Sequence, residues 1–299
     1  MMEQHIARCA VRALYAELVL EPKPGLVSLR DNGSHTDMTA ATFVKSLFAL
    51  RHYFGHMARA GAQAQPFGCL QALGLDAEAR MLTATGGVNT HRGAVFALGL
   101  LCAAAGRLSK QGDVLTAQGL RDCLVSQWGQ ALRARAEAAA RSAPVSNGQR
   151  AARRFGLRSA AEEAAMGFPT LFEITLPALQ AALQAGHAPR AARVQAFFAT
   201  MAVLDDTNVA HRGGWEGVQF VKNSAQAFLD AGGVAQAHWL QPARAIHTAC
   251  VARRLSPGGA ADVLAAACWL HEVQQPIKPA AKPAAHPAPR ALLECVEAA

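Results

Sequence analysis

Residues 85–101, TGGVNTHRGAVFALGLL, set a cluster of polar side chains directly against an apolar run. Two glycines lead into Asn89, Thr90, His91 and Arg92, and the chain then becomes wholly apolar. An apolar run of this length has to be buried, so the polar cluster lies at its tip. We interpret the run as a core helix whose N-terminus opens onto a bound anion, because free N–H groups and the helix dipole both favour negative charge there.

The composition of the whole chain agrees with a helical protein. Hydrophobic residues make up 52% of the 299 residues and aromatic residues only 6%, with alanine and leucine dominant. Both are strong helix formers, and no segment alternates convincingly at period two. We therefore predict an all-α fold, a single large multi-helix orthogonal bundle over residues 1–273 with little or no sheet. Residues 274–299, rich in proline, alanine and lysine, are expected to form a disordered tail.

Helical periodicity and capping signals divide the predicted domain. Ser34, Thr36 and Asp37 offer N-caps for the second helix, and Pro257 with two glycines precedes the last. Residues 133–158 hold seven arginines against the single acid Glu137, which we interpret as a solvated helix face and a mobile loop. The helices are expected at about residues 3–20, 37–60, 69–84, 91–106, 113–141, 158–166, 175–186, 190–204, 215–231, 235–254 and 259–273.

Charge and cysteine content restrict the class of protein. The formal charge of +8 favours anionic partners, but it does not choose among nucleotides, coenzymes, nucleic acid and membrane surfaces. The seven cysteines are scattered without a C-x-x-C pair, which is typical of reduced thiols in the cytoplasm. The longest uncharged apolar run, residues 94–106, is too short to span a bilayer. We expect a soluble cytoplasmic protein that does not bind a membrane.

Five polar clusters interrupt the apolar helical pattern, and two of them are alike. Residues 89–93 and 208–214 each place an amide, an imidazole, a guanidinium and a glycine near a predicted helix end, which suits phosphate binding. Gly86 and Gly87 would let the backbone approach a ligand closely. The remaining clusters are residues 21–38, residues 152–169 with Glu162 and Glu163, and residues 256–267 with Asp262.

The acidic residues of the cluster around Asp205 suit a magnesium ion. On a helix, Asp205 and Asn208 would share a face, with Asp206 about 100° away. Carboxylates beside an amide suit an octahedral Mg²⁺ that keeps waters and takes substrate phosphates as ligands. Neither His91 nor His211 belongs to an H-x-x-x-H pair, so we do not expect zinc.

Each candidate also has a purely structural interpretation. A histidine beside an arginine is more often a structural hydrogen-bonding group than a catalyst. Asp205 and Asp206 could simply flank a turn. Asp262 could be a favourable charge at the N-terminus of its helix.

The clusters together carry a resemblance to a known family. The chain resembles the triphosphoribosyl-dephospho-coenzyme A synthases, which make the prosthetic-group precursor of citrate lyase and malonate decarboxylase, and the malonate decarboxylase branch is favoured. The family usually has an arginine where Ala161 stands, two residues before Glu163, so Arg153, Arg154 or Arg158 would have to replace it. The matching stretches are EPKPGLVSLRDNGSHTDM, AEARMLTATGGVNTHRGAVFALGLLCAAAG, EAAMGFPTLFEITLPAL, LDDTNVAHRGGWEGVQFVK and LSPGGAADVLAA.

The resemblance implies a reaction between ATP and 3′-dephospho-coenzyme A. The 2′-hydroxyl of the dephospho-coenzyme attacks the anomeric carbon of the ATP ribose, adenine leaves, and the configuration inverts in a single displacement. A holo-acyl-carrier-protein transferase that acts downstream is a possible partner. The oligomeric state stays open.

Such a displacement needs a base on the nucleophile, a proton donor for the leaving group, and Mg²⁺ with basic residues for the triphosphate. The catalytic candidates are Asp37, Asp206 and Asp262, and any of the three could be the base. The candidate metal ligands are Glu78, Asp205, Asp206 and Asn208. The candidate substrate- and phosphate-binding residues are Lys23, His35, Gly86, Gly87, Asn89, Thr90, His91, Arg92, His211, Arg212 and Gly213.

Two other functions fit parts of the sequence. A magnesium-dependent all-helical N-glycosidase or ADP-ribosyl-type hydrolase would use the same acids, with water as the nucleophile. A basic helical RNA-binding protein is weakly favoured by residues 133–158, but the chain lacks an aromatic-interleaved basic patch. We therefore expect no nucleic-acid partner.

Overall fold

Helices joined by loops are the regular elements of residues 2–276, the part of the chain that the computed structural model describes. This part contains no strand, so the predicted all-α class is confirmed. Most of the predicted tail, residues 277–299, lies outside the described residues. The elements are α1 (Met2–Leu18), α2 (Ala40–Leu50), α3 (Tyr53–Ala62), α4 (Phe67–Thr85), α5 (Arg92–Gln111), α6 (Ala117–Arg141), α7 (Asn147–Phe155), α8 (Ala160–Ala165), the π-helical turn η1 (Thr170–Thr175), α9 (Leu176–Gln184), α10 (Pro189–Val203), α11 (Thr207–Asp230), the 3-10 turn η2 (Gly233–Ala235), α12 (Leu240–Ala252) and α13 (Gly258–Val273).

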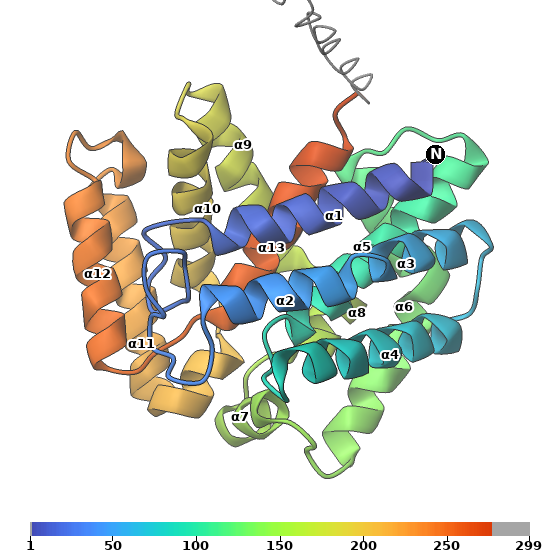
Figure 1. Cartoon of the computed structure of the whole chain (residues 1–299), viewed down its shortest axis with the longest axis horizontal. Coiled ribbons are helices and arrows are strands. Elements are labelled where there is room, and N and C mark those ends of the chain that lie inside the picture. The colour runs from blue at the N-terminus through green and yellow to red at the C-terminus, as the bar shows by residue number, and fades with distance from the viewer. Residues whose placement is uncertain (1, 277–299) are drawn as a thin grey trace, which may run out of the picture.

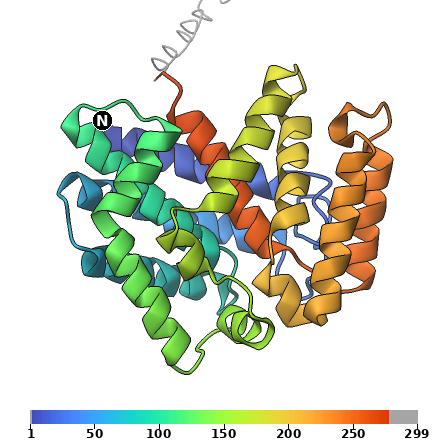
Figure 2. The ribbon, with the colours of Figure 1, turned by 180° about the vertical axis from the view of Figure 1, so that it is seen from behind.

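The helices form two groups that cross at a steep angle. Figure 1 shows α1 to α4 running across the view, whereas α10, α11 and α12 run roughly perpendicular to them. Seen from behind in Figure 2, α6 and α7 lie over the opposite face of the bundle. This crossing brings the loops at the ends of several helices toward the start of α13.

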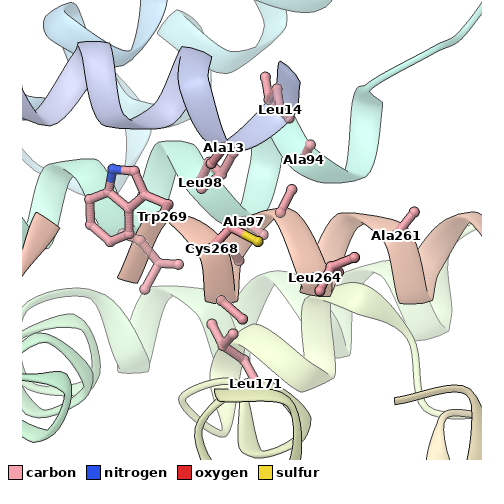
Figure 3. Close-up of a cluster of buried hydrophobic side chains, with 14 of the residues drawn as sticks. Ala13, Leu14, Ala94, Ala97, Leu98, Leu171, Ala261, Leu264, Cys268 and Trp269 are labelled. Carbon is pink, nitrogen blue, oxygen red and sulfur yellow. The ribbon is translucent and has the colours of Figure 1, made fainter. Parts of the chain in front are cut away.

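The apolar run that follows the polar tip is a buried helix, as the sequence predicts. In α5, Leu98, Leu101 and Cys102 are fully buried. Its apolar length would suffice to cross a membrane, but 72% of its most apolar window is buried inside the bundle. Figure 3 shows side chains of α5 meeting those of α1 and α13 in one cluster, where the Trp269 indole Nε1–H donates to the carbonyl of Ile6 (3.2 Å).

Glycines allow α3 and α5 to approach each other closely. A Cβ on Gly61 would lie 1.8 Å from the carbonyl oxygen of Ala103, and one on Gly106 would lie 1.8 Å from that of Ala58. No other residue fits at these two points without moving a backbone. The contact therefore fixes α5 against α3, and with it the position of the polar tip.

The predicted helix over residues 37–60 is wrong in two respects. It consists of α2 and α3, with a break at residues 51–52, and α2 begins only at Ala40 with Thr39 as its N-cap. The predicted cap Ser34 instead donates its hydroxyl to the carbonyl of Leu255 (2.6 Å). Residues 31–38 thus form a loop tied to the α12–α13 connection, so their capping side chains are not at a helix start.

Two further differences concern the arginine-rich segment and α11. The arginine-rich segment contains α7, whose Ser146 cap accepts from the backbone N–H of Gln149 (3.2 Å), and Arg153 donates to the carbonyl of Ala140 (2.8 Å) at the end of α6. Helix α11 begins at residue 207 rather than 215 because Asp206 caps it, and it bends at Gly214, where φ is 63°.

Candidate active site

Asp206 joins the starts of two helices. Its Oδ1 accepts hydrogen bonds from the backbone N–H groups of Asn208 (2.8 Å) and Val209 (3.4 Å) in α11. Its Oδ2 accepts from the backbone N–H of Ala260 (3.0 Å) in α13, and a Cβ on Gly259 would lie 3.0 Å from the same oxygen. Burial raises the pKa of the Asp206 carboxyl, and the backbone N–H groups act in the opposite direction. Asp206 is therefore a buried acid with a clear capping role.

The predicted pairing of Asp205 with Asn208 on one helix face is wrong. Asp205 precedes the helix, and its carboxylate pairs with the ammonium of Lys222 (2.7 Å). Asn208 stays beside Asp206, with its side-chain nitrogen 3.0 Å from the position of a Cβ on Gly258. The α13 start thus collects Asp206 and Asn208 but not Asp205.

Asp262 lies at the start of α5 as well as in α13. A Cβ on Gly93 would lie only 2.0 Å from its Oδ2, and its carboxyl accepts a hydrogen bond from the backbone N–H of Ala94. Burial first, and then the negative charges of Glu17 and Asp206, raise the pKa of Asp262 well above its usual value. The sequence predicts a bound anion at the start of α5. In the structure a carboxyl of the protein itself lies there, and its surroundings favour the protonated, neutral acid.

A buried ion pair lies beside these acids. The ammonium of Lys23, only 2% exposed, pairs with the carboxylate of Glu17 and donates to the Glu17 carbonyl (2.9 Å). An ammonium has three donors, so one remains for a ligand. We refer to Glu17, Asp206 and Asp262 as the acid cluster. With the ammonium of Lys23 beside it, three carboxyls and one cation lie together.

His91 is a buried, neutral imidazole with one free nitrogen. Its Nδ1 lies 2.6 Å from the Ser46 hydroxyl, and its ring meets Phe43 edge-on. Burial first, and then the charge of Lys23, lower the pKa of His91 to about 3. Neither its Nε2 nor the buried hydroxyl of Thr90 has a hydrogen-bond partner among residues 2–276. Because Ser46 has no other acceptor in this part of the chain, its hydroxyl donates to Nδ1, which leaves the proton of the neutral ring on Nε2.

The rest of the polar tip is partly engaged within the protein. The backbone N–H of Arg92 donates to the side-chain oxygen of Asn89 (3.1 Å), and its guanidinium pairs with Glu78 (3.0 Å). Gly86 and Gly87 have φ values of 68° and 90°, and the space beside their Cα atoms is open. Glycine is therefore required there by the left-handed turn that ends α4, and the tip stays accessible to a ligand.

Residues 31–38, the second half of the polar cluster at residues 21–38, are held in place by α11. The guanidinium of Arg212 donates to the carbonyl of Ser34 (3.1 Å) and to Nδ1 of His35 (3.1 Å). The opposite nitrogen of His35 lies 2.8 Å from the buried hydroxyl of Ser256, and burial followed by the charge of Arg212 lowers the pKa of His35. Asp37 lies 3.5 Å from the same ring. These contacts position the loop.

The other two candidates of the cluster at residues 208–214 differ in their surroundings. His211 is exposed. A Cβ on Gly213 would lie 2.4 Å from Leu255, so glycine is needed there for packing.

Glu163 has a defined structural partner despite the substitution at Ala161. Its carboxylate pairs with Arg158 (2.9 Å) and accepts from the backbone N–H of Thr170 (2.7 Å) at the start of η1. Of the three arginines that could replace the missing one, Arg158 makes the contact. Glu163 therefore holds the π-helical turn against α8.

The four candidate metal ligands do not form one site. Glu78 and Asp205 each pair with a basic residue, and Asp206 accepts several backbone hydrogen bonds. Within residues 2–276, no three His, Cys, Asp or Glu side chains are grouped so as to hold a metal ion. The donor set suits at most a metal that brings most of its ligands with it, as magnesium bound to phosphates does.

Sequence reasoning missed Glu17 and Ser46. Glu17 is the last acid of an otherwise apolar helix face, which could have identified it as a buried charge in need of a partner. Ser46 lies in the middle of α2 and is fully buried. Nothing in its local sequence indicates His91, which is 45 residues away.

The fold and the site define a class of protein: an all-helical protein whose helix starts gather buried acids, a neutral histidine and basic residues. The chain belongs to the ATP:dephospho-CoA triphosphoribosyl transferase family (CitG), whose model matches residues 3–280. It is accordingly a transferase of the triphosphoribosyl-dephospho-CoA synthase type.

Several curated relatives cover most of the chain. The 2-(5''-triphosphoribosyl)-3'-dephosphocoenzyme-A synthase of Pectobacterium atrosepticum is 41% identical over 264 residues, 86% of this chain and 85% of the relative. The synthase of Klebsiella pneumoniae is 37% identical, covering 89% and 90% of the two chains. A probable synthase of Pseudomonas syringae pv. tomato is 38% identical, covering 95% and 96%. No solved structure matches the chain.

Proposed function

We propose that this enzyme joins the ribose C1′ of ATP to the 2′-hydroxyl of 3′-dephospho-coenzyme A and releases adenine. The observation that carries the proposal is the position of Asp262, a carboxyl at the start of α5 with Glu17 and Asp206 beside it. Burial and the neighbouring negative charges raise the pKa of this carboxyl and so favour its protonated form, which can donate a proton to a leaving base.

Asp262 acts as the general acid in this scheme. The C1′–N9 bond breaks, its electron pair goes to the purine, and the proton of Asp262 makes the departing adenine neutral. Asp206, whose carboxylate is stabilised by backbone N–H groups, supports the positive charge that develops at C1′. Asp37, the most exposed of the three candidate acids, remains the candidate base for the 2′-hydroxyl.

Four groups around the acid cluster would hold the substrates. His91 offers its neutral Nε2–H, Lys23 its third ammonium proton, and Arg92 the guanidinium nitrogens not used by Glu78. Asn89 and the two glycines before it shape the accessible tip. Of these donors, His91 is neutral, so it can bind a substrate without reducing the negative potential of the acid cluster.

Magnesium enters this proposal as part of the substrate complex Mg·ATP. Asp206 and Asn208 are the only two candidate ligands that lie together, which is too few for a preformed protein site. The ion would neutralise part of the triphosphate charge. Glu78 and Asp205 instead hold Arg92 and Lys222 in place.

The proposal extends to the biological role. We place the product in the assembly of the prosthetic group of malonate decarboxylase, with citrate lyase as the alternative, and a holo-acyl-carrier-protein transferase as the enzyme that uses it. The catalytic domain would comprise residues 1–273. Its location would be the cytoplasm, where ATP is available.

The direct test is turnover by the purified protein. ATP, Mg²⁺ and 3′-dephospho-coenzyme A are incubated with it, and mass spectrometry follows free adenine and the triphosphoribosylated product. We expect both in equal amounts, loss of both in Asp262→Asn, and normal turnover in the control Asp76→Asn, which changes an exposed aspartate paired with Arg80. Adenine release without the coenzyme would indicate a hydrolase, and no product with any enzyme preparation would refute the proposal.

A further inference from the structure

A cleft of about 200 Å³ opens between the loop that follows α1 and helix α12. Figure 1 shows this loop beside α12, at the end of the molecule where α1 finishes. Of the residues that line the cleft, only Lys23 has a role in the proposed function, through its ammonium on the side of the acid cluster. It is lined by Glu21, Pro22, Lys23, Ser28, Arg30, Asp31, Arg244, His247 and Thr248.

Arginines outnumber the acids at the cleft's edge. The carboxylate of Glu21 is surrounded by the guanidinium groups of Arg244 (3.0 Å), Arg190 and Arg30 (3.8 Å). Glu21 and Asp31 are the two carboxylates that line the cleft, and together they cannot neutralise three guanidinium groups, so the edge keeps a small surplus of positive charge. Burial would raise the pKa of Glu21, but the hydrogen bond and charge of Arg244, with the other two arginines, lower it overall. Glu21 therefore stays ionised and holds the arginines in place.

Most carboxylate oxygens of the cleft are already engaged within the protein. Glu21 is engaged by the arginines, and Asp31 lies 3.3 Å from Nε2 of His247. A cation would find only part of the Asp31 carboxylate there, whereas an anion would find planar guanidinium donors that match phosphate oxygens. The hydroxyls of Ser28 and Thr248 line the same space. These groups suit a phosphate ester that binds without magnesium.

The cleft and the acid cluster share one wall. Lys23 lies between them: its carbonyl accepts from Nδ1 of His247 (3.1 Å) on the cleft side, and its ammonium pairs with Glu17 on the other. A ligand in the cleft is therefore separated from the acid cluster by a single stretch of loop. A substrate that spans this distance could place its phosphates in the cleft and its ribose toward the acid cluster.

We propose that this cleft binds the diphosphate of 3′-dephospho-coenzyme A. The inference rests on the proposed function, in which two phosphorylated substrates must bind at once. ATP also contains a diphosphate, but its triphosphate is bound with Mg²⁺, and the cleft offers few free carboxylate oxygens to accompany a metal. The metal-free diphosphate of the dephospho-coenzyme is the better chemical match.

The test compares the affinities for the two substrates. Dissociation constants for 3′-dephospho-coenzyme A, Mg·ATP and inorganic pyrophosphate are measured by calorimetry on the wild type, Arg244→Gln and Arg30→Gln. Losing a charge-assisted hydrogen bond should weaken the binding of 3′-dephospho-coenzyme A about tenfold or more, whereas the dissociation constant for Mg·ATP should stay within about twofold of the wild-type value. Arg59→Gln, which removes an exposed arginine paired with Glu3, is the matched control and should change neither.

Arg30→Gln separates binding from folding, because Arg30 is the arginine farthest from Glu21 and its side chain is 64% exposed. Weaker Mg·ATP binding in this variant would assign the cleft to the triphosphate and overturn the proposal. Unchanged affinity for 3′-dephospho-coenzyme A in both variants would overturn it as well. Binding is measured without turnover, so a wild-type protein that binds the dephospho-coenzyme in this way but forms no product would refute the proposed reaction and not the cleft.

Discussion

Replacing Gly93 by alanine should disable the enzyme while leaving its fold nearly as stable. The new methyl group would lie 2.0 Å from Oδ2 and 2.8 Å from Cγ of Asp262, where ordinary contacts begin at 3.4 Å. The carboxyl therefore has to move by more than an ångström. Misplacement on this scale can reduce turnover by about 100-fold.

The stability terms of this substitution nearly cancel. Alanine in place of glycine favours a helix by about 0.8–1 kcal/mol. Moving Asp262 weakens its hydrogen bond from the N–H of Ala94, at a cost of about 0.5–1.5 kcal/mol. We expect the free energy of unfolding, measured in urea, to change by no more than about 1 kcal/mol.

The assay follows adenine release in a double-mutant cycle. Gly93→Ala is made in the wild type and in Asp262→Ala, where the methyl group no longer meets a carboxyl. The substitution should then cause no further loss of turnover, because both changes act on the same group. Gly68→Ala, at a helical position with open space around it, is the control and should keep full activity. Near-normal turnover of Gly93→Ala, or an equal loss in both backgrounds, would refute the reasoning.

Three further predictions concern the buried groups around Asp262. The pKa of Asp262 is raised in the folded state. Its contribution to the stability of the fold is therefore greatest below the ordinary aspartate pKa of about 3.9 and is lost as the pH rises through the raised pKa. Asp262→Asn should therefore be stabilised relative to the wild type at pH 8 more than at pH 4, and a pH-independent difference in urea unfolding would contradict this. Lys23→Met should lower the free energy of unfolding by about 3–5 kcal/mol, because it leaves the Glu17 carboxylate buried without a partner. Adding Glu17→Gln should recover much of that loss, whereas additive losses would contradict the ion pair. Nitrogen-15 NMR should find His91 with its proton on Nε2, and Ser46→Ala should give a mixture of tautomers; a proton on Nδ1 in the wild type would reverse the assigned hydrogen bond.

The core helices could be predicted from the sequence because each carries its own signal. The apolar run after Arg92 and the Pro-Gly-Gly before α13 both locate the start of a helix to within one residue, although α5 ends five residues later than predicted. The start of α2 could not be located in this way. Ser34 and Asp37 have side chains that can cap a helix, but both are engaged elsewhere. Ser34 bonds to Leu255, which is remote in sequence, and Asp37 lies beside His35 in the same loop.

The sequence allowed the types of residue in the candidate site to be predicted, but not the contacts between them. The sequence identifies Asp262 as an isolated charge in an apolar helix, but its natural interpretation is a charge at the start of its own helix. In the structure the carboxyl lies at the start of α5, because Gly93 lets α13 pack against that end. A sequence shows where helices begin and end, but not which side chain of another helix meets each end.

The most direct test of the account is a crystal structure of the enzyme with Mg²⁺ and a non-reacting ATP analogue. The account predicts the purine within hydrogen-bond reach of the Asp262 carboxyl, about 2.6–3.2 Å, and the phosphates near Arg92 and Lys23. A nucleotide bound elsewhere, for example over the arginines of α6 and α7, with the acid cluster untouched, would contradict it.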